Sequence, residues 1–229
     1  MIPEARTQPS IRRDFVEWHR GRQPYVFWAL DVDVPAVADD VARHARLLGD
    51  ALLEGYCRQP HVTLDVCGFP SRRPLYDDEF GPALLARQLA ALRLARPEPF
   101  SIEIGEADSF LSAPYLTVRD TEGGIGALRR CLAIDGAHRL FGDYVPHVTI
   151  GLYARSLLFS ELRARLLAGR CDGLVFPVAR LSLMGYAPAE IGGRLDRLAD
   201  YELAACDWRW CDAAPLDALD FLRAGAPES

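Results

Sequence analysis

Two copies of one short motif hold the residues of this chain that are best suited to chemistry. Pro60-His61-Val62-Thr63-Leu64 reappears as Pro146-His147-Val148-Thr149-Ile150, so the copies use two of only five histidines in 229 residues. A free imidazole titrates near pH 6.5, and both of its protonation states are therefore accessible at neutral pH. One histidine could take a proton from water or a ribose hydroxyl while the other protonates a leaving oxygen. Threonine hydroxyls could donate hydrogen bonds to the phosphate oxygens on which charge develops. The motif therefore predicts cleavage of a phosphodiester.

Each copy is predicted to lie on a β-strand that separates polar from apolar side chains. Side chains of a strand alternate between its two faces, so the aliphatic residues of each copy would be buried. The opposite faces would carry His61, Thr63 and Asp65 in the first copy, and His147, Thr149, Gly151 and Tyr153 in the second. Two such strands, placed side by side by a duplicated fold, would line a cleft with two histidines and two threonines.

Other interpretations of these residues are open. Each histidine could be a half-buried strand residue with satisfied hydrogen bonds, although the recurrence of the whole motif disfavours this. A metal site needs a third ligand of suitable geometry. Asp65 would share the His61 face, but the second copy has no counterpart, and none of the six cysteines forms a C-x-x-C pair. We therefore expect no metal and no other cofactor.

Composition excludes several classes of function. The net charge is −6, whereas a non-specific duplex-DNA binder is usually basic. All 26 basic residues are arginine, which excludes a lysine nucleophile and a phosphate-loop lysine. No apolar run approaches the roughly 18 residues of a membrane span, and the polar start lacks a secretory signal. We therefore expect a cytoplasmic protein that binds neither a membrane nor duplex DNA.

The hydrophobic pattern predicts an α+β fold. Strand patterns alternate with helical ones and no flexible linker divides the chain. Strands are expected around residues 25–30, 61–67, 100–104, 115–119, 147–153, 181–183 and 200–205, and helices over 36–54, 79–95, 124–135, 156–168 and 215–223.

The two H-x-T-hydrophobic motifs resemble those of the 2H phosphoesterase superfamily, which includes bacterial 2′-5′ RNA ligase-like proteins and plant-type cyclic phosphodiesterases. Tyr25-Val-Phe-Trp-Ala-Leu30 is similar to the opening strand of that family, and Leu181-Ser-Leu-Met184 to its late strand. The segment Tyr144-Val-Pro-His-Val-Thr is similar to the approach to its second motif. The resemblance covers residues 25–205, so residues 1–24 and 206–229 are expected to be terminal extensions.

The resemblance implies a bilobal fold with pseudo-two-fold duplicated antiparallel sheets, outer helices and a central cleft. It also implies a metal-independent phosphodiesterase for 2′,3′-cyclic phosphates or 2′-5′ linkages of a nucleotide or RNA end, with ligation as a possible direction. By position, His61 and His147 would be the acid and base, and Thr63 and Thr149 would hold the phosphate. Trp28 matches an aromatic residue that lies near the substrate in that family. The alternative, given equal weight, is that Trp28 is a core residue.

Some positions depart from the family pattern. Tyr153 lies one position later than the corresponding aromatic residue but is expected to face the substrate, while Leu152 replaces an arginine that often follows the second motif. These departures are the basis of a second hypothesis, in which the protein has the same fold but only binds a nucleotide or phosphate without catalysis. We expect a monomer in either case.

Overall fold

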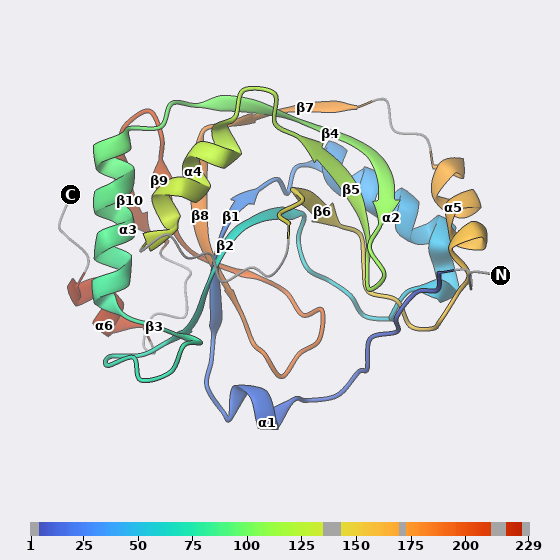
Figure 1. Cartoon of the computed structure of the whole chain (residues 1–229), viewed down its shortest axis with the longest axis horizontal. Helices are drawn as coiled ribbons and strands as arrows, with labels where there is room; N and C mark the ends of the chain where they lie inside the picture. The colour runs from blue at the N-terminus through green and yellow to red at the C-terminus, as the bar shows by residue number, and fades with distance from the viewer. Residues whose placement is uncertain (1–4, 135–142, 170–172, 212–218, 226–229) are drawn as a thin grey trace.

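Ten strands form two sheets in the part of the chain described by this computed structural model, residues 5–134, 143–169, 173–211 and 219–225. The first sheet has the order β10-β9-β8-β1-β2-β3, and the second has the order β6-β5-β4-β7 (Figure 1). Neighbouring strands are antiparallel except for β2 and β3. The first sheet contains β1 (Tyr25–Asp31), β2 (His61–Pro70), β3 (Glu79–Phe80), β8 (Arg180–Tyr186), β9 (Asp196–Glu202) and β10 (Asp207–Trp210). The second contains β4 (Phe100–Ser109), β5 (Pro114–Arg119), β6 (His147–Thr149) and β7 (Leu174–Val178).

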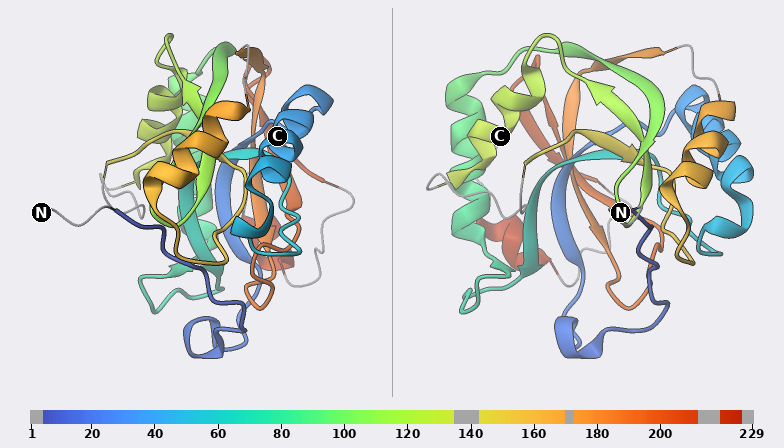
Figure 2. Two further views of the ribbon diagram at one scale, coloured as in Figure 1. Left: turned by 90° about the vertical axis from the view of Figure 1, so that its right-hand side faces the viewer. Right: turned by 45° about the vertical axis from the view of Figure 1, so that its right-hand side comes forward.

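Apart from α1 (Val16–His19), which lies beyond the start of β1 in Figure 1, the described helices cover the two ends of the molecule. They are α2 (Pro35–Leu48), α3 (Pro82–Ala95), α4 (Gly124–Leu132), α5 (Phe159–Ala168) and α6 (Asp220–Gly225), and a short 3₁₀ turn (Gly49–Ala51) follows α2. Figures 1 and 2 show α3, α4 and α6 at one end and α2 beside α5 at the other. The expected α+β class and bilobal arrangement of antiparallel sheets with outer helices are confirmed. No helix among the described residues combines the length and the apolar character needed to cross a membrane.

A strand–helix–strand unit occurs twice, and each copy ends with one of the motifs. In the first unit α2 connects β1 to β2, and in the second α4 connects β5 to β6. The two strands of each unit pair with each other, so that His61 lies opposite Asp31 and His147 lies opposite Thr117. The duplication places both histidines at the first position of their strands.

Local signals explain where the connecting helices begin and end. Pro35 occupies the first turn of α2, where its missing N–H costs no hydrogen bond, and Gly49 follows the helix with φ +48°. The Asp120 carboxylate accepts hydrogen bonds from the backbone N–H groups of Gly124 and Ile125 at 3.0 and 2.8 Å. These bonds satisfy two of the amides that the start of α4 leaves without partners inside the helix.

The two sheets share one hydrophobic core. The aliphatic residues of both motifs, Val62, Leu64, Val148 and Ile150, belong to the same buried cluster as Leu116 of β5. Their burial fixes which face of β2 and β6 is turned inward, and the histidines and threonines must then lie on the other face.

Candidate active site

Both motif histidines are oriented by the same local hydrogen bond. The Nδ1 atom of His61 donates to the carbonyl of Gln59 at 2.8 Å, and that of His147 donates to the carbonyl of Val145 at 2.7 Å. Pro60 and Pro146 separate each histidine from its acceptor, and a proline keeps the preceding residue extended. A carbonyl only accepts, so each neutral ring carries its proton on Nδ1 and leaves Nε2 able to accept one.

The two motifs lie next to each other although they belong to different sheets. Strand β2 contacts β6, and the Tyr144 hydroxyl, three residues before His147, donates a hydrogen bond to the backbone carbonyl of Thr63 at 2.9 Å. The two imidazoles are close enough for His147 to lower the pKa of His61. The structure therefore brings both histidines and both threonines into one region.

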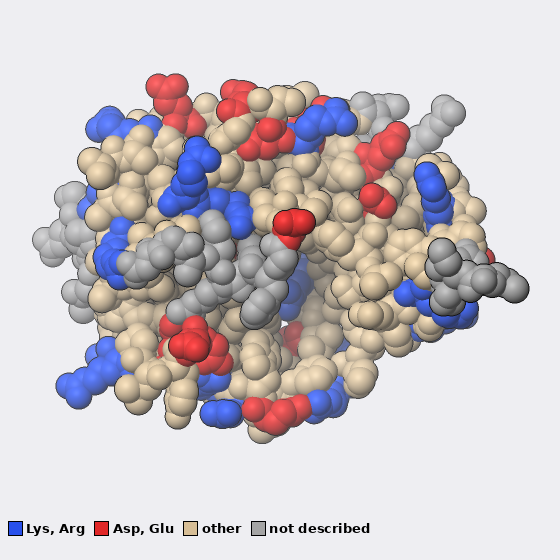
Figure 3. Space-filling model, in the orientation of Figure 1, with Lys and Arg blue, Asp and Glu red and all other residues tan. Residues whose placement is uncertain are grey.

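The molecular surface is hollowed near the middle of the face shown in Figure 3, beside the loop that joins β8 to β9, with charged side chains at the floor of the hollow. Aromatic rings support each histidine: Phe27 lies 5.5 Å from the His61 ring, and Phe110 and Tyr115 lie 4.9 and 5.4 Å from the His147 ring. These contacts restrict the rotation of both imidazoles.

Burial favours the neutral form of both rings. The pKa of His61 is lowered from 6.5 to about 4: desolvation is the largest cause, the nearby charges of Arg58 and His147 also lower it, and the hydrogen bond to Gln59 and the charge of Asp31 oppose the shift. Desolvation also lowers the pKa of His147. Both histidines are therefore ready to accept a proton at neutral pH, and either would need a bound anion to stabilise its charged form.

The His61 pKa predicts that acid weakens the fold. The folded chain holds this ring neutral down to about pH 4, whereas the unfolded chain protonates it below about pH 6.5. The contribution of His61 to the free energy of unfolding is complete above pH 6.5 and is lost as the pH falls through 4. The loss is on the order of 3 kcal/mol. Urea unfolding at several pH values should show a shallower acid-side slope for His61→Gln than for the wild type. Equal slopes would contradict this assignment.

Arg58 is a site residue that the sequence analysis missed. Its guanidinium lies 4.0 Å from the centre of the Tyr186 ring, and Tyr186 contacts Phe27 beside His61. The Nε atom of Arg58 is buried and has no hydrogen-bond partner among the described residues. A buried donor without a partner is costly, so Arg58 is suited to bind an anion that enters beside His61.

Other charged groups near His61 pair with one another. Arg197 lies 3.4 Å from one carboxylate oxygen of Asp31 and 3.7 Å from a carboxylate oxygen of Asp200. Arg180 lies at 3.8 and 4.0 Å from the same two carboxylates. Asp31, the register neighbour of His61, raises the His61 pKa, but this effect is smaller than those of burial, the Gln59 hydrogen bond, Arg58 and His147.

The predicted position of Asp65 on the His61 face is wrong. A β-bulge interrupts the pairing of β1 and β2, so that Ala29 lies opposite Thr63 but Trp28 lies opposite Asp65. The strand changes face at this point, and Val66 rather than Asp65 packs with Phe27. Among the described residues, no three His, Cys, Asp or Glu side chains are grouped as a metal site.

Trp28 and Tyr153 do not line the site. Trp28 is fully buried, and its indole N–H donates to Gln88 Oε1 at 2.9 Å within the core. Tyr153 is also fully buried, and its hydroxyl hydrogen-bonds to Ser109. Strand β6 ends at Thr149, so the alternation that predicts Tyr153 on the His147 face does not extend that far. The expected substrate contacts of both residues are therefore corrected.

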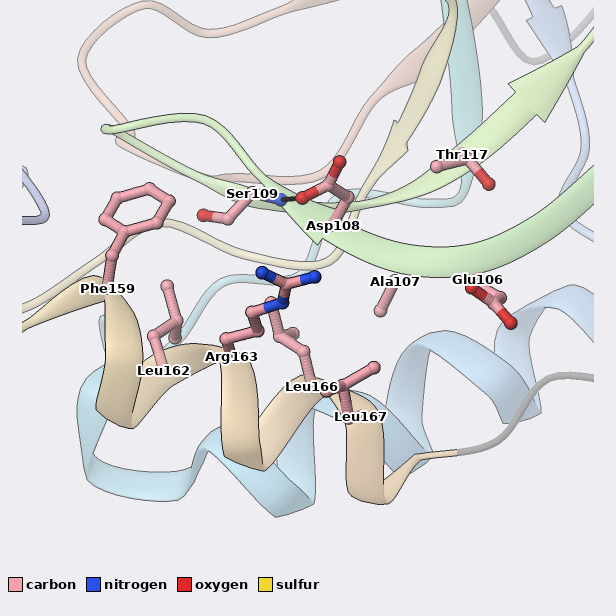
Figure 4. A pocket seen from close by; sticks show the side chains of 10 residues that line it. All are labelled: Glu106, Ala107, Asp108, Ser109, Thr117, Phe159, Leu162, Arg163, Leu166 and Leu167. Carbon is pink, nitrogen blue, oxygen red and sulfur yellow. Dashed lines mark hydrogen bonds between the residues drawn. The ribbon is translucent and has the colours of Figure 1, made fainter. Parts of the chain in front are cut away.

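A separate cavity of about 410 Å³ lies between β4 and α5 (Figure 4). Arg163 extends from α5 towards Asp108, while Glu106 and several leucines also line the space. None of the four motif residues lines this cavity. Its two carboxylates make it a poor site for a phosphate.

Comparison with known protein families places the chain in one of them. The family model described as "2'-5' RNA ligase superfamily" matches residues 33–190, which is more than half of the chain. The chain belongs to this superfamily, the 2H phosphoesterases, whose members are enzymes of the phosphoesterase and ligase type. A comparison with curated protein sequences found no match.

Several solved structures are similar over most of the chain. Escherichia coli LigT complexed with 3′-AMP is 18% identical, with a TM-score of 0.47 over 79% of this chain and 98% of that one. The protein TT0787 of Thermus thermophilus is also 18% identical, with a TM-score of 0.49 over the same shares. LigT complexed with ATP is 19% identical, with a TM-score of 0.45 over 80% of this chain and 98% of that one.

Proposed function

We propose that this protein is a metal-independent phosphodiesterase that acts on a 2′,3′-cyclic phosphate or a 2′-5′ linkage of a nucleotide or RNA end. One observation carries the proposal. Two histidines from duplicated units lie near each other, and each has its Nδ1 atom bound to the carbonyl two residues earlier. This arrangement leaves two Nε2 atoms for the two proton transfers of a phosphodiester reaction.

The proposed reaction with a cyclic phosphate uses one water molecule. Because its pKa is low, His61 is unprotonated at neutral pH, and its Nε2 atom can accept a proton from water as the water oxygen forms a bond to phosphorus. The bond between phosphorus and one ribose oxygen breaks, and His147 gives its proton to that oxygen. The products are a phosphomonoester and a free ribose hydroxyl. Joining a 2′-5′ linkage would use the same two transfers with a ribose hydroxyl in place of water.

The bound phosphate would prepare the acid. Its negative charge favours the protonated form of a neighbouring imidazole and therefore opposes the desolvation that lowers the His147 pKa. Thr63 and Thr149 would donate hydrogen bonds to non-bridging oxygens, and Arg58 would add a charge-assisted bond. In this proposal, side chains of the protein neutralise the negative charge of the phosphate, and no metal ion is needed for that purpose.

Arg58→Gln should weaken the binding of an anionic substrate. A hydrogen bond to a charged group contributes about 1.5–3 kcal/mol, so kcat/KM is expected to fall by roughly tenfold to a hundredfold. The variant should also show a weaker dependence on salt than the wild type. Arg163→Gln, at the cavity beside α5, is the matched control and should leave both quantities unchanged. Equal kinetics for Arg58→Gln and wild type would exclude Arg58 from substrate binding.

The activity itself can be tested with a panel of 2′,3′-cyclic nucleotides and 2′-5′ dinucleotides in the presence of a chelator. We expect a phosphomonoester or a nucleoside as the product. The rate of its formation should be the same with and without the chelator. Activity that disappears with chelator and returns with a divalent metal would replace it with a metal-dependent mechanism.

A non-catalytic phosphate- or nucleotide-binding protein is the alternative. The hydroxyls of the motif threonines and the unbonded Arg58 Nε atom could hold an anion without turning it over. Such a protein would be stabilised by the nucleotides of the panel, with a rise in melting temperature, but would release no product over hours. Product formation would exclude this alternative.

A further inference from the structure

A continuous line of aromatic rings leads away from His61 along one face of the first sheet. Phe27 lies 5.5 Å from the His61 ring, and Tyr186 follows at 6.1 Å from Phe27. Tyr25 lies 5.7 Å from Tyr186, and Trp18 of α1 lies 5.0 Å from Tyr25. We call Phe27, Tyr186, Tyr25 and Trp18 the aromatic track.

The rings of the track do not cover one another's faces. Successive planes are tilted by 51° to 58°, unlike the face-to-face pair of Phe110 and Tyr115 at 28°. Trp18 is 38% exposed, and Tyr25 and Tyr186 are half-buried, whereas Phe27 is buried beneath them. Trp18 therefore presents accessible surface on which a planar group can stack, and Tyr25 and Tyr186 are partly accessible beside it, although the Arg58 guanidinium covers one face of the Tyr186 ring.

Trp18 is held in place by a chain of polar contacts rather than by a long helix. Arg22 donates a hydrogen bond to the Trp18 carbonyl at 3.1 Å and two bonds to the Asp78 carboxylate at 2.8 Å each. The bidentate pair connects the N-terminal segment to the approach of β3. An immobilised ring loses little conformational freedom when a ligand stacks on it.

We propose that the aromatic track binds the bases that precede the terminal phosphate of a single-stranded RNA. The proposal rests on the proposed function of the histidine pair, and it identifies the substrate class as an oligonucleotide rather than a mononucleotide. Aromatic rings with interspersed guanidinium groups are the recognition elements of single strands, because every base has a face that can stack. Arg58 over Tyr186 supplies such a group near His61, where the strand would end.

The track includes a part of the chain outside the segment that matches the family model. That match begins at residue 33, whereas Trp18 and Tyr25 precede it. Figure 1 shows α1 at the end of β1 that is farthest from β6, so the N-terminal segment lengthens the face on which a strand can lie. The N-terminal segment would thus extend the substrate-binding surface beyond the histidine site.

Binding experiments test the track independently of catalysis. The probes are a fluorescently labelled pentanucleotide with a 3′-terminal phosphate and an analogue in which the upstream nucleotides lack bases. Both carry the same phosphates, so electrostatic attraction is matched. Wild type is expected to bind the complete strand at least roughly tenfold more tightly, because base–aromatic stacking contributes about 1–3 kcal/mol per base.

Variants of Trp18 test the same binding preference in a second experiment. Trp18→Ala should reduce the preference for the complete strand about tenfold, whereas Trp18→Phe should retain most of that preference. The control Leu94→Ala truncates an exposed apolar side chain on α3 and should leave the preference unchanged. Turnover of 2′,3′-cyclic AMP should be equal in wild type and Trp18→Ala.

The two proposals fail in different ways. Equal affinity of wild type for the complete and abasic strands would overturn the track even if cyclic AMP is hydrolysed. A strong, Trp18-dependent preference without turnover of any substrate would support the track and overturn the proposed catalytic function.

Discussion

Replacing His61 or His147 with alanine is expected to lower the turnover of a 2′,3′-cyclic nucleotide by about 10²–10⁴-fold while the chain stays folded. Each change removes one of two proton transfers that the proposed reaction needs. The double variant should be little worse than either single variant, because residues that act as a unit show strongly non-additive effects. Steady-state kinetics of the three variants checks both expectations.

Two controls separate chemistry from folding in this experiment. His61→Gln and His147→Gln keep a polar side chain of similar size but cannot transfer a proton at neutral pH, so they should be as inactive as the alanine variants. His19→Gln changes a buried histidine that pairs with Asp14 in the N-terminal segment and should turn over the mononucleotide normally. Full turnover by either alanine variant would remove that histidine from the mechanism.

Trp28→Ala is expected to destabilise the fold by about 3–5 kcal/mol, the usual cost of removing a large aromatic side chain from a core. The ring packs 5.5 Å from that of Trp208, and its N–H is bonded to Gln88. The substitution would leave both a cavity and a buried acceptor without its donor. Equilibrium urea unfolding measures the loss.

The matched substitution at an exposed position distinguishes a core role from substrate binding. Trp18→Ala removes the same side chain from a site that is 38% exposed and should cost no more than about 1 kcal/mol of unfolding free energy. Trp28→Phe should recover part of the stability and keep an unchanged KM for a cyclic mononucleotide. A raised KM with near wild-type stability would instead place Trp28 against the substrate.

The recurring motif makes the fold class and the histidine pair predictable, because a duplicated sequence implies a duplicated unit. The alternation of each copy also indicates that its aliphatic residues are buried, as Val62 and Val148 are. Whether the histidines approach each other depends on how the two sheets meet, and no local pattern specifies that.

The aromatic residue beside His61 could not be chosen from the sequence. Phe27 and Trp28 are neighbours in an apolar run of β1, so alternation places them on opposite faces without indicating which face carries His61. The pairing of β1 with β2 places Phe27 on the face of His61. The bulge in that pairing also moves Asp65 to the other face. A bulge depends on the partner strand and leaves little trace in a single sequence.

Strand ends are predicted less well than strand positions. The pattern of the second motif predicts a strand to residue 153, but β6 stops at Thr149. The amide of Ile150 donates to the carbonyl of Pro114 at the start of β5, and Tyr153 then forms an isolated bridge with Leu52. Conversely, the sequence does not predict β10, although Trp208 packs against Trp28. The predicted helix over 215–223 lies partly outside the described residues, which include α6 (Asp220–Gly225).

The most direct test of the histidine pair is a crystal structure of the protein soaked with inorganic phosphate. The account predicts one phosphate within hydrogen-bond distance of the Nε2 atoms of both His61 and His147, with Arg58 turned towards it. A phosphate that contacts only one imidazole, or that binds away from both, would contradict the shared anion site on which the proposed reaction depends.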